Sequence, residues 1–272
     1  MNKIGIFSWF GYNLGHEDNL RLIKNAGFDA ASLYWREGVE FNTPDLARKI
    51  GLEIDNVHSP FLNPIVADWL WHEGEKGDYI QDLHISCIED CKKYDIPVSV
   101  IHLTSSEERP LTEIGLNRIA KIIDTAEHNE VKIAFENIQH QELFSIVMER
   151  FKSPNVGFCY DSGHENISIN YWKIKDLDLL SQYGNRLFAL HLHDNFGDND
   201  DHLIPFDGEI DWAKKMKSIK NSRSVEYLTL ELTFDMNNKR CEIYNDLLPE
   251  ELLDKAYKNA IKLLDFNSTG RL

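Results

Sequence analysis

An aspartate and a histidine three residues apart, Asp161 and His164, stand in the stretch 158–166, which reads FCYDSGHEN. The largely apolar residues before the aspartate indicate a buried strand that ends at the carboxylate. Gly163 lets the chain turn sharply there, so we expect the imidazole of His164 on the loop just beyond the strand. A carboxylate oxygen and an imidazole nitrogen placed in this way can bind one divalent metal ion.

The same arrangement recurs at the ends of the other predicted strands. Six of these ends carry a residue that binds metal ions through oxygen or nitrogen: His58, His102, Glu136, Asp161, His191 and Glu231. Similar side chains follow the later strands at His164, Asp200 and His202. The chain has 11 histidines and 45 acidic residues, so some would reach strand ends by chance. Chance does not readily account for the whole set.

Each of these residues also has a purely structural interpretation. A histidine such as His58 or His102, at the edge of a core, is commonly held there by a hydrogen bond. Glu136 and Glu231 differ because each interrupts an apolar strand. A carboxylate in that position is costly to bury unless it is paired or bound to a metal ion, which favours a function for both.

The remaining histidines divide into two groups. His191 and His193 lie two residues apart and therefore point the same way from a strand. We expect one of them to be a ligand and the other a neighbour. Asp194 could orient a ligand imidazole by accepting its second N–H. Solvent exposure is expected for the histidines on predicted helices and loops: His16, His72, His84, His128 and His140.

These residues depend on a regular succession of elements. Strands are predicted at 3–9, 30–35, 53–61, 98–104, 132–138, 156–161, 186–194 and 227–234. Helices are predicted at 16–27, 44–51, 79–94, 111–128, 141–151, 175–183, 212–219 and 250–264. Alternating strands and helices imply parallel pairing, and eight such units close into a (β/α)8 TIM barrel. We therefore predict an α/β fold and a single domain over residues 1–272, with the active site at the C-terminal ends of the strands.

The main alternative is an open doubly wound sheet, which would carry a Gly-rich phosphate turn after its first strand. Residues 8–15 read SWFGYNLG and lack that pattern. A long connection at 62–78 contains Trp69 and Trp71. Two tryptophans in so polar a loop indicate either packing onto a neighbouring helix or a lid over a small ligand.

Composition and charge disfavour some classes of binding partner and indicate a cellular location. The net charge of −16 gives the chain no general attraction for nucleic acid or anionic lipid. Cys87 and Cys91 lie four residues apart on a predicted helix and are expected to pack on one face. No apolar run reaches the ~18 residues of a membrane span, and no signal-peptide pattern opens the chain. We expect a cytoplasmic protein with reduced cysteines.

The motifs together resemble the xylose isomerase-like TIM-barrel superfamily, which contains sugar-phosphate isomerases and epimerases, ketose 3-epimerases, and AP endonucleases of the endonuclease-four type. They are NVHSPF at 56–61, FEN at 135–137, YDSGH at 160–164, HLHDN at 191–195, DHL at 201–203, DGEIDW at 207–212 and Glu231. The resemblance covers nearly the whole chain and does not select one member. One departure stands out: the usual Pro-Gly-x-Gly appears here as Pro205-Phe206-Asp207-Gly208, so the backbone approach to a ligand there is expected to differ.

The resemblance implies roles for particular residues. The four ligands of the single metal site in the epimerases match Glu136, Asp161, His191 and Glu231. His164 matches a residue that touches substrate, and His58 and His102 are further substrate-binding candidates. The endonuclease branch holds three zinc ions, and its additional ligands would fall on His58, His102, His164, Asp200 and His202.

We predict a metal-dependent isomerase or epimerase of a sugar or sugar phosphate. Its cofactor would be a divalent ion, Mn, Zn, Mg or Co, that stabilises the negative charge of an enediolate. Glu136 and Glu231, on opposite sides of the mouth, would remove and return a proton. Trp9 and Trp69 could contact the sugar ring, as could Trp35, for which core packing is an equal alternative.

The alternative is an AP endonuclease with a zinc cluster, which would need basic loops to hold DNA. Loops 62–78 and 194–211 contain one lysine, Lys76, and many acids, so a nucleic-acid partner is disfavoured. A non-catalytic sugar-binding barrel would not require both carboxylates. The sequence does not identify the sugar or whether it is phosphorylated. A homo-oligomer is expected only by analogy with the superfamily.

Overall fold

The computed structural model describes residues 3–37, 43–60, 67–104, 111–138, 141–174, 178–233 and 238–269. Within these residues, eight strands form one parallel sheet. The strands are β1 (Lys3–Phe7), β2 (Ala30–Tyr34), β3 (Glu53–His58), β4 (Val98–Ile101), β5 (Lys132–Glu136), β6 (Val156–Asp161), β7 (Leu187–His191) and β8 (Tyr227–Leu230). Their order in the sheet is β7-β6-β5-β4-β3-β2-β1-β8. The ring closes between the first and last of these through a parallel bridge from Leu192 to Leu230.

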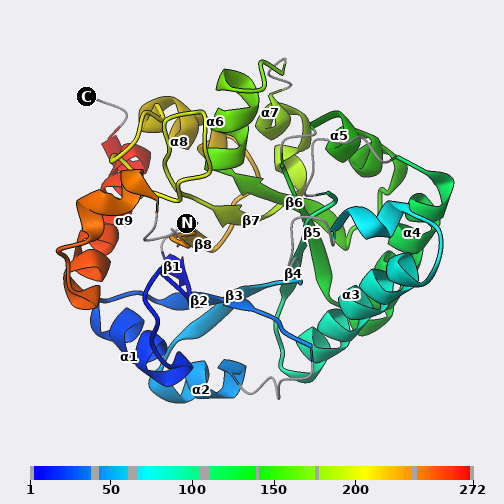
Figure 1. Ribbon diagram of the computed structural model, residues 1–272, viewed down its shortest axis with the longest axis horizontal. Helices are drawn as coiled ribbons and strands as arrows, with labels where there is room; N and C mark the ends of the chain where they lie inside the picture. The colour runs from blue at the N-terminus through cyan, green and yellow to red at the C-terminus, as the bar shows by residue number, and fades with distance from the viewer. Residues whose placement is uncertain are drawn as a thin grey trace.

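Helices surround this ring (Figure 1). They are α1 (His16–Asn25), α2 (Thr43–Ile50), α3 (Glu75–Lys93), α4 (Glu113–Asn129), α5 (Gln141–Arg150), α6 (Ser162–Asn170), α7 (Leu179–Tyr183), α8 (Trp212–Lys220) and α9 (Pro249–Thr269). Three 3-10 helices accompany them: η1 (Ala67–Trp71), η2 (Gly184–Arg186) and η3 (Lys239–Tyr244). The architecture is a single-domain (β/α)8 TIM barrel, and this prediction is confirmed.

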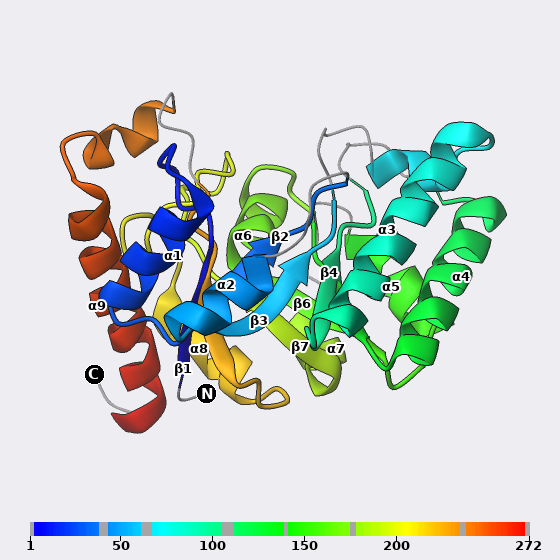
Figure 2. The ribbon, with the colours of Figure 1, turned by 90° about the horizontal axis from the view of Figure 1, so that it is seen from below.

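All strands run in one direction, so their C-terminal ends lie at one rim of the barrel. Figure 2 shows this rim at the top, where η1 and η3 also lie. The rim gathers the residues that the sequence places at strand ends, because parallel strands linked by helices all begin at one end of the barrel and finish at the other. Several strands end earlier than predicted: β4 ends at Ile101 and β8 at Leu230, so His102 and Glu231 follow their strands directly.

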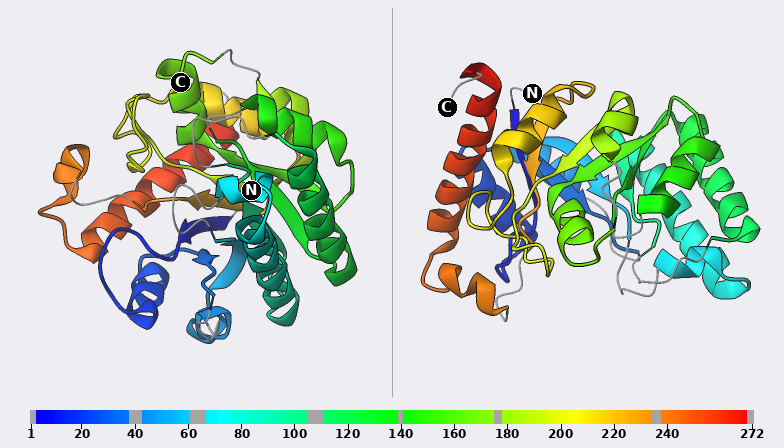
Figure 3. Two further views of the ribbon diagram at one scale, coloured as in Figure 1. Left: turned by 45° about the vertical axis from the view of Figure 1, so that its right-hand side comes forward. Right: turned by 90° about the horizontal axis from the view of Figure 1, so that it is seen from above.

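The apolar core lies between the ring of strands and the helices. In α4 the side chains of Ile119, Ile122 and Ile123 are buried and recur at the spacing of one helical face. Cys87 and Cys91 are buried free thiols on α3, as their spacing predicts. Helix α9 lies beside α1 and α8, near the start of the chain (Figure 3), so the last element covers the first strand.

Helix α6 corrects the prediction of a loop after Asp161. Ser162 begins the helix, and the carboxylate of Asp161 caps it by accepting a hydrogen bond from the backbone N–H of His164 at 2.6 Å. An Asp at this position stabilises a helix because it satisfies one of the free N–H groups of the first turn. His164 therefore lies on a helix, which holds its imidazole more rigidly than a loop would.

The described part of the connection before α3 contains more regular structure than predicted. Its residues 61–66, like the predicted helix positions 175–177 and His140, lie outside the described residues. Trp69 and Trp71 belong to η1, and α3 begins at Glu75 rather than at residue 79. Trp71 is buried and donates a hydrogen bond from Nε1 to the carbonyl of Leu103 at 2.6 Å. Trp71 therefore packs into the core, while Trp69 is half-buried.

Arg118 ties this segment to α4. Its guanidinium is 3% exposed and donates hydrogen bonds to the carbonyls of Leu70 at 3.0 Å and of His72, and to the carboxylate of Asp78 at 3.0 Å. One side chain thus satisfies several acceptors at the start of α3.

His84 corrects a second prediction, because it is buried rather than solvated. It lies on α3 with 1% of its surface exposed, and its Nδ1 is 2.6 Å from Ser59 Oγ. Its Nε2 has no hydrogen-bond partner among the described residues. Burial, together with the nearby imidazoles of His58 and His102, lowers the pKa of His84 to about 3.

A search of the described helices finds none with the length and apolar character that crossing a membrane requires.

Replacing Arg118 by Met is expected to lower the free energy of unfolding by ~3 kcal/mol, because buried carbonyls and Asp78 lose their donor. Equilibrium unfolding in urea measures the change. Arg21→Met is the matched control, since Arg21 is exposed and its ion pair among the described residues is with Glu17 one helical turn away, an interaction worth a few tenths of a kcal/mol. Equal losses in the two variants would contradict the structural role of Arg118.

The depressed pKa of His84 predicts acid sensitivity. The unfolded chain binds a proton at this residue below pH ~6.5 while the folded chain does not until pH ~3, so stability falls as the pH drops through this window. Replacing His84 by Gln should remove ~2 kcal/mol of the stability lost between pH 7 and pH 5. Urea unfolding of wild type, His84→Gln and the exposed-residue control His128→Gln at both pH values tests this. Parallel pH profiles for wild type and His84→Gln would refute it.

Candidate metal centre and active site

Four strands in succession deliver the inner group of side chains, Glu136, Asp161, His191 and Glu231. The first three are the last residues of β5, β6 and β7, and Glu231 follows β8 directly. Asp161 and His191 are aligned partners across β6 and β7. Because these parallel strands all end at the same rim of the barrel, the four side chains enter one space.

The four side chains are close enough to share an ion. One donor atom from each lies within 4.8 Å of the donor atoms of the others, and all four residues are buried. His191 Nδ1 is 2.8 Å from Glu231 Oε2 and 3.0 Å from Glu136 Oε2. The two glutamates therefore contact the same imidazole nitrogen.

Several atoms of this inner group lack the hydrogen bonds that burial requires. Both carboxylate oxygens of Glu136, Oε2 of Glu231 and both ring nitrogens of His191 have no partner with hydrogen-bond geometry in the described part of the chain. A buried carboxylate without partners is strongly unfavourable. Carboxylate oxygens and an imidazole nitrogen are the donor atoms that divalent ions such as zinc bind. The donor set therefore fits a metal ion.

The electrostatics point the same way. Burial alone would raise the pKa of Glu136, but the imidazoles of His102 and His191 hold it well below its usual value. Burial would likewise raise the pKa of Glu231, and His191 lowers it to about 2. The pKa of His191 is raised well above its usual value, against the effect of burial, by the acidic groups Cys159, Glu231 and Glu136. The pocket therefore attracts positive charge.

His58 and His102 meet the inner group at Glu136. Their Nε2 atoms are 3.5 and 3.3 Å from Glu136 Oε2 and 3.2 Å from each other. His58 Nδ1 is 2.8 Å from the carbonyl of Ser59, so it donates there and leaves its Nε2 lone pair facing the pocket. One donor atom each from His58, Glu136 and His191 also lies within 4.8 Å of the others.

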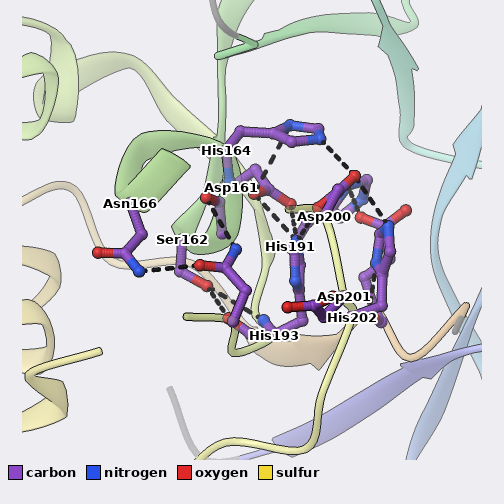
Figure 4. A network of polar contacts seen from close by, with 12 residues as sticks. Asp161, Ser162, His164, Asn166, His191, His193, Asp200, Asp201 and His202 are labelled. Carbon is purple, nitrogen blue, oxygen red and sulfur yellow. Dashed lines mark hydrogen bonds and ion pairs between the residues drawn. The ribbon is translucent and has the colours of Figure 1, made fainter. Parts of the chain in front are cut away.

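A second, outer group lies beside the first (Figure 4). His193, Asp200 and His202 place donor atoms within 4.8 Å of one another. His164 belongs to both groups, with Nδ1 3.0 Å from Glu136 Oε1 and Nε2 3.2 Å from Asp200 Oδ2. The sequence predicted His164, Asp200 and His202 at this place, and the structure adds His193.

The loop after β7 brings the outer group into position. His202 adopts φ +49°, which is uncommon for a residue with a Cβ. Phe206 also adopts positive φ, +78°, so the missing glycine of the Pro-Gly-x-Gly pattern does not prevent that conformation. Asp194 does not orient a ligand imidazole as predicted: it accepts hydrogen bonds from Phe206 N at 2.9 Å, Ile210 N at 3.1 Å and Trp212 Nε1 at 2.7 Å. Its carboxylate instead organises this loop.

The three aromatic candidates differ in their exposure and contacts. Trp9 follows β1 and is 46% exposed at the rim. Trp69 lies in η1 beneath Lys76, whose Nζ is 4.8 Å from its ring centre. Trp35 is buried and donates from Nε1 to Asp90 at 2.7 Å, which is a core position. Contact of Trp9 and Trp69 with a sugar therefore stays a prediction.

Sequence reasoning missed Asn137 and Ser162 as supports of the site. Asn137 Oδ1 accepts from the backbone N–H of Asp161 and its Nδ2 donates to the carbonyl of Asp161, both at 2.8 Å. Ser162 Oγ donates to the carbonyl of His193 at 2.8 Å. Each directly follows a strand-end residue of the inner group, and that adjacency was the available signal.

The sequence was compared with protein families and with individual proteins. Residues 20–256 match the model of the xylose isomerase-like TIM barrel family. The uncharacterized protein y4fM of Sinorhizobium fredii is 27% identical, over 82% of this chain and 83% of that protein. Protein MJ1311 of Methanocaldococcus jannaschii is 26% identical, over 80% of this chain and 79% of that protein.

Solved structures share the fold. One is the IolI protein with a bound zinc atom, with a TM-score of 0.75 and 20% identity over 98% of this chain and 100% of the other. Another is a D-tagatose 3-epimerase-like protein, with a TM-score of 0.71 and 19% identity over the same shares. L-ribulose 3-epimerase gives a TM-score of 0.71 at 16% identity over 100% of both chains. With the family model spanning most of its length, this chain belongs to the xylose isomerase-like TIM-barrel family.

Proposed function

We propose that this protein is a divalent-metal-dependent isomerase or epimerase of a sugar or sugar phosphate. The observation that carries the proposal is the pair of buried carboxylates, Glu136 and Glu231, which both contact His191 Nδ1 at the mouth of the barrel. Ketose 3-epimerases among the proteins with this fold support the same class of substrate.

Glu136, Asp161, His191 and Glu231 would hold the ion. A divalent ion there, such as Mn, Zn, Co or Mg, supplies Lewis acidity that stabilises negative charge on a substrate oxygen next to the reacting carbon. Both carboxylate oxygens of Glu136, Oε2 of Glu231 and the ring nitrogens of His191 support this assignment, since they are left without hydrogen bonds among the described residues.

The two glutamates would also move the proton. They enter the mouth from β5 and β8, which are not neighbours in the barrel, so they approach a bound sugar from different directions. One carboxylate would take a proton from the carbon and the other would return one to it. A carboxylate that holds the ion through one oxygen keeps its second oxygen available for this transfer.

Other residues would bind the substrate. His102 and His164 each contact Glu136 at the mouth of the barrel. His102 is half-buried and His164 is buried, and their ring nitrogens would bind sugar hydroxyls. His58 lies deeper and would act through its Nε2 atom. Trp9 and Trp69 would present apolar faces to the sugar ring. The four buried free cysteines fit the expected cytoplasmic location.

The runner-up is a phosphodiesterase of the AP-endonuclease type. The observation in its favour is the outer group, because His164, Asp200 and His202, together with His58 and His102, could hold further zinc ions. Against it, loops 62–78 and 194–211 carry Lys76 as their single lysine and no arginine. A surface so rich in acids would repel the phosphates of DNA.

Glu136→Gln and Glu231→Gln are each expected to lower kcat for epimerisation by about 100-fold or more, because each removes one proton-transfer group. Steady-state assays over a panel of free and phosphorylated ketoses measure this. The control is Glu209→Gln, an exposed glutamate of the loop after β7, which should retain activity. Wild-type activity in both Glu136→Gln and Glu231→Gln would contradict the two-carboxylate mechanism.

Removal of the ion by a chelator should abolish activity, and Mn, Co, Zn or Mg should restore it to different extents. An ion held at ~100 times its Kd adds ~2.7 kcal/mol to the free energy of unfolding, so the Tm should fall on removal. Elemental analysis should find one ion per chain if the inner site alone is used. Three ions per chain, together with nicking of duplex DNA at an abasic site, would favour the endonuclease instead.

A further inference from the structure

His193 belongs to the outer group and also contacts Asp161 of the inner group. Its Nε2 is 3.1 Å from Asp161 Oδ2 and 3.2 Å from Asp161 Oδ1, and 3.6 Å from Asp200 Oδ1. Its ring stacks on His202 with centres 4.1 Å apart and planes inclined by 23°. Figure 4 shows this imidazole between the Asp161 and Asp200 side chains.

The local backbone is built around this ring. Ser162 Oγ donates to the carbonyl of His193 at 2.8 Å and accepts from its backbone N–H at 3.0 Å. A Cβ at Gly163 would overlap the His193 ring. Gly163 lies in the first turn of α6 and does not adopt positive φ, so the glycine provides space for the imidazole rather than a sharp turn.

The contacts determine which nitrogen carries the proton. An ionised carboxylate only accepts hydrogen bonds, so Nε2, which faces both oxygens of Asp161, is the donor. Nδ1 is buried without a hydrogen-bond partner in the described ranges, which suits an unprotonated nitrogen better than an N–H. A nitrogen that donates a proton to a carboxylate cannot bind a metal ion through the same atom.

Asp161 is thereby held from several directions. Its Oδ1 accepts from the backbone N–H of His164 at 2.6 Å, and Asn137 bonds its backbone on both sides. His193 supplies the side-chain donor. Hydrogen bonds of this kind keep a metal-binding carboxylate in one orientation and lower the conformational freedom lost when the ion binds.

We propose that His193 is a positioning residue that holds Asp161 for the ion of the inner group and is not itself a ligand of an ion in the outer group. The inference rests on the proposed metal role of the inner group. It also separates His193 from Asp200 and His202, although all three place donor atoms close together.

Two measurements on the whole protein test this proposal. Competition with a chromogenic chelator gives the zinc affinity, and elemental analysis gives the number of ions per chain. His193→Leu removes the donor and should weaken zinc binding at the inner site ~10- to 100-fold without changing the number of ions. His193→Gln keeps an N–H that can reach Asp161 and should recover most of that affinity. His128→Leu, an exposed histidine on α4, is the control and should match wild type.

A third variant guards against misfolding of His193→Leu. Gly163→Ala keeps every candidate ligand but displaces the His193 ring, and it should weaken zinc binding in the same direction. Wild-type affinity in both His193→Leu and Gly163→Ala would overturn the inference. Loss of one ion per chain in His193→Leu and His193→Gln alike would show that His193 is a ligand. A wild-type protein that bound no zinc, manganese, cobalt or magnesium would instead overturn the proposed metal dependence, which is a different outcome.

Discussion

Negative charge buried at the mouth of the barrel is the constraint on which the rest of this structure depends. Glu136, Asp161 and Glu231 converge around His191 with donor atoms within 4.8 Å. Two like charges about 4 Å apart repel by ~4 kcal/mol at an effective dielectric constant of 20. Such a group persists only if cationic partners surround it and the remaining fold supplies enough stability. The extensive apolar core between strands and helices supplies that stability.

The same charges explain the ring of histidines. His58, His102 and His164 all contact Glu136, although they come from β3, from the segment after β4 and from α6. Imidazole is the side chain that can serve as proton donor, cation or metal ligand without a long flexible stem. A lysine or arginine at these positions would neutralise the acids permanently. Histidines leave the site able to receive an ion or a substrate.

Buried acids also organise the loop that completes the site. Asp194 gathers backbone N–H groups from residues 195, 206 and 210, and Asp201 accepts from Asn238 at 2.8 Å and Arg240 at 2.9 Å. A loop held at so many points can keep His202 and Phe206 at positive φ, a conformation that costs free energy. The outer group is therefore presented by a rigid loop, and His164 and His193 connect it to the inner group.

The sequence by itself determined the succession of eight strand and helix units and the residue types at the strand ends. Both follow from local patterns: apolar runs, helical spacing, and charged residues that interrupt a strand. Because parallel strands in a closed barrel end at one rim, the meeting of Glu136, Asp161, His191 and Glu231 could be predicted without coordinates.

Only the tertiary structure decided how the neighbours of these residues are used. His84 looked like a solvated helix residue, yet α3 packs it against Ser59, which directly follows β3. His193 was expected only as a neighbour of the ligand His191, yet contacts with Ser162, Gly163 and Asp161 turn its donor toward a carboxylate. Asp194 looked like a partner of a ligand, yet it holds the loop that ends at Trp212. These outcomes depend on contacts between residues far apart in the chain, and the local sequence carries no record of those contacts.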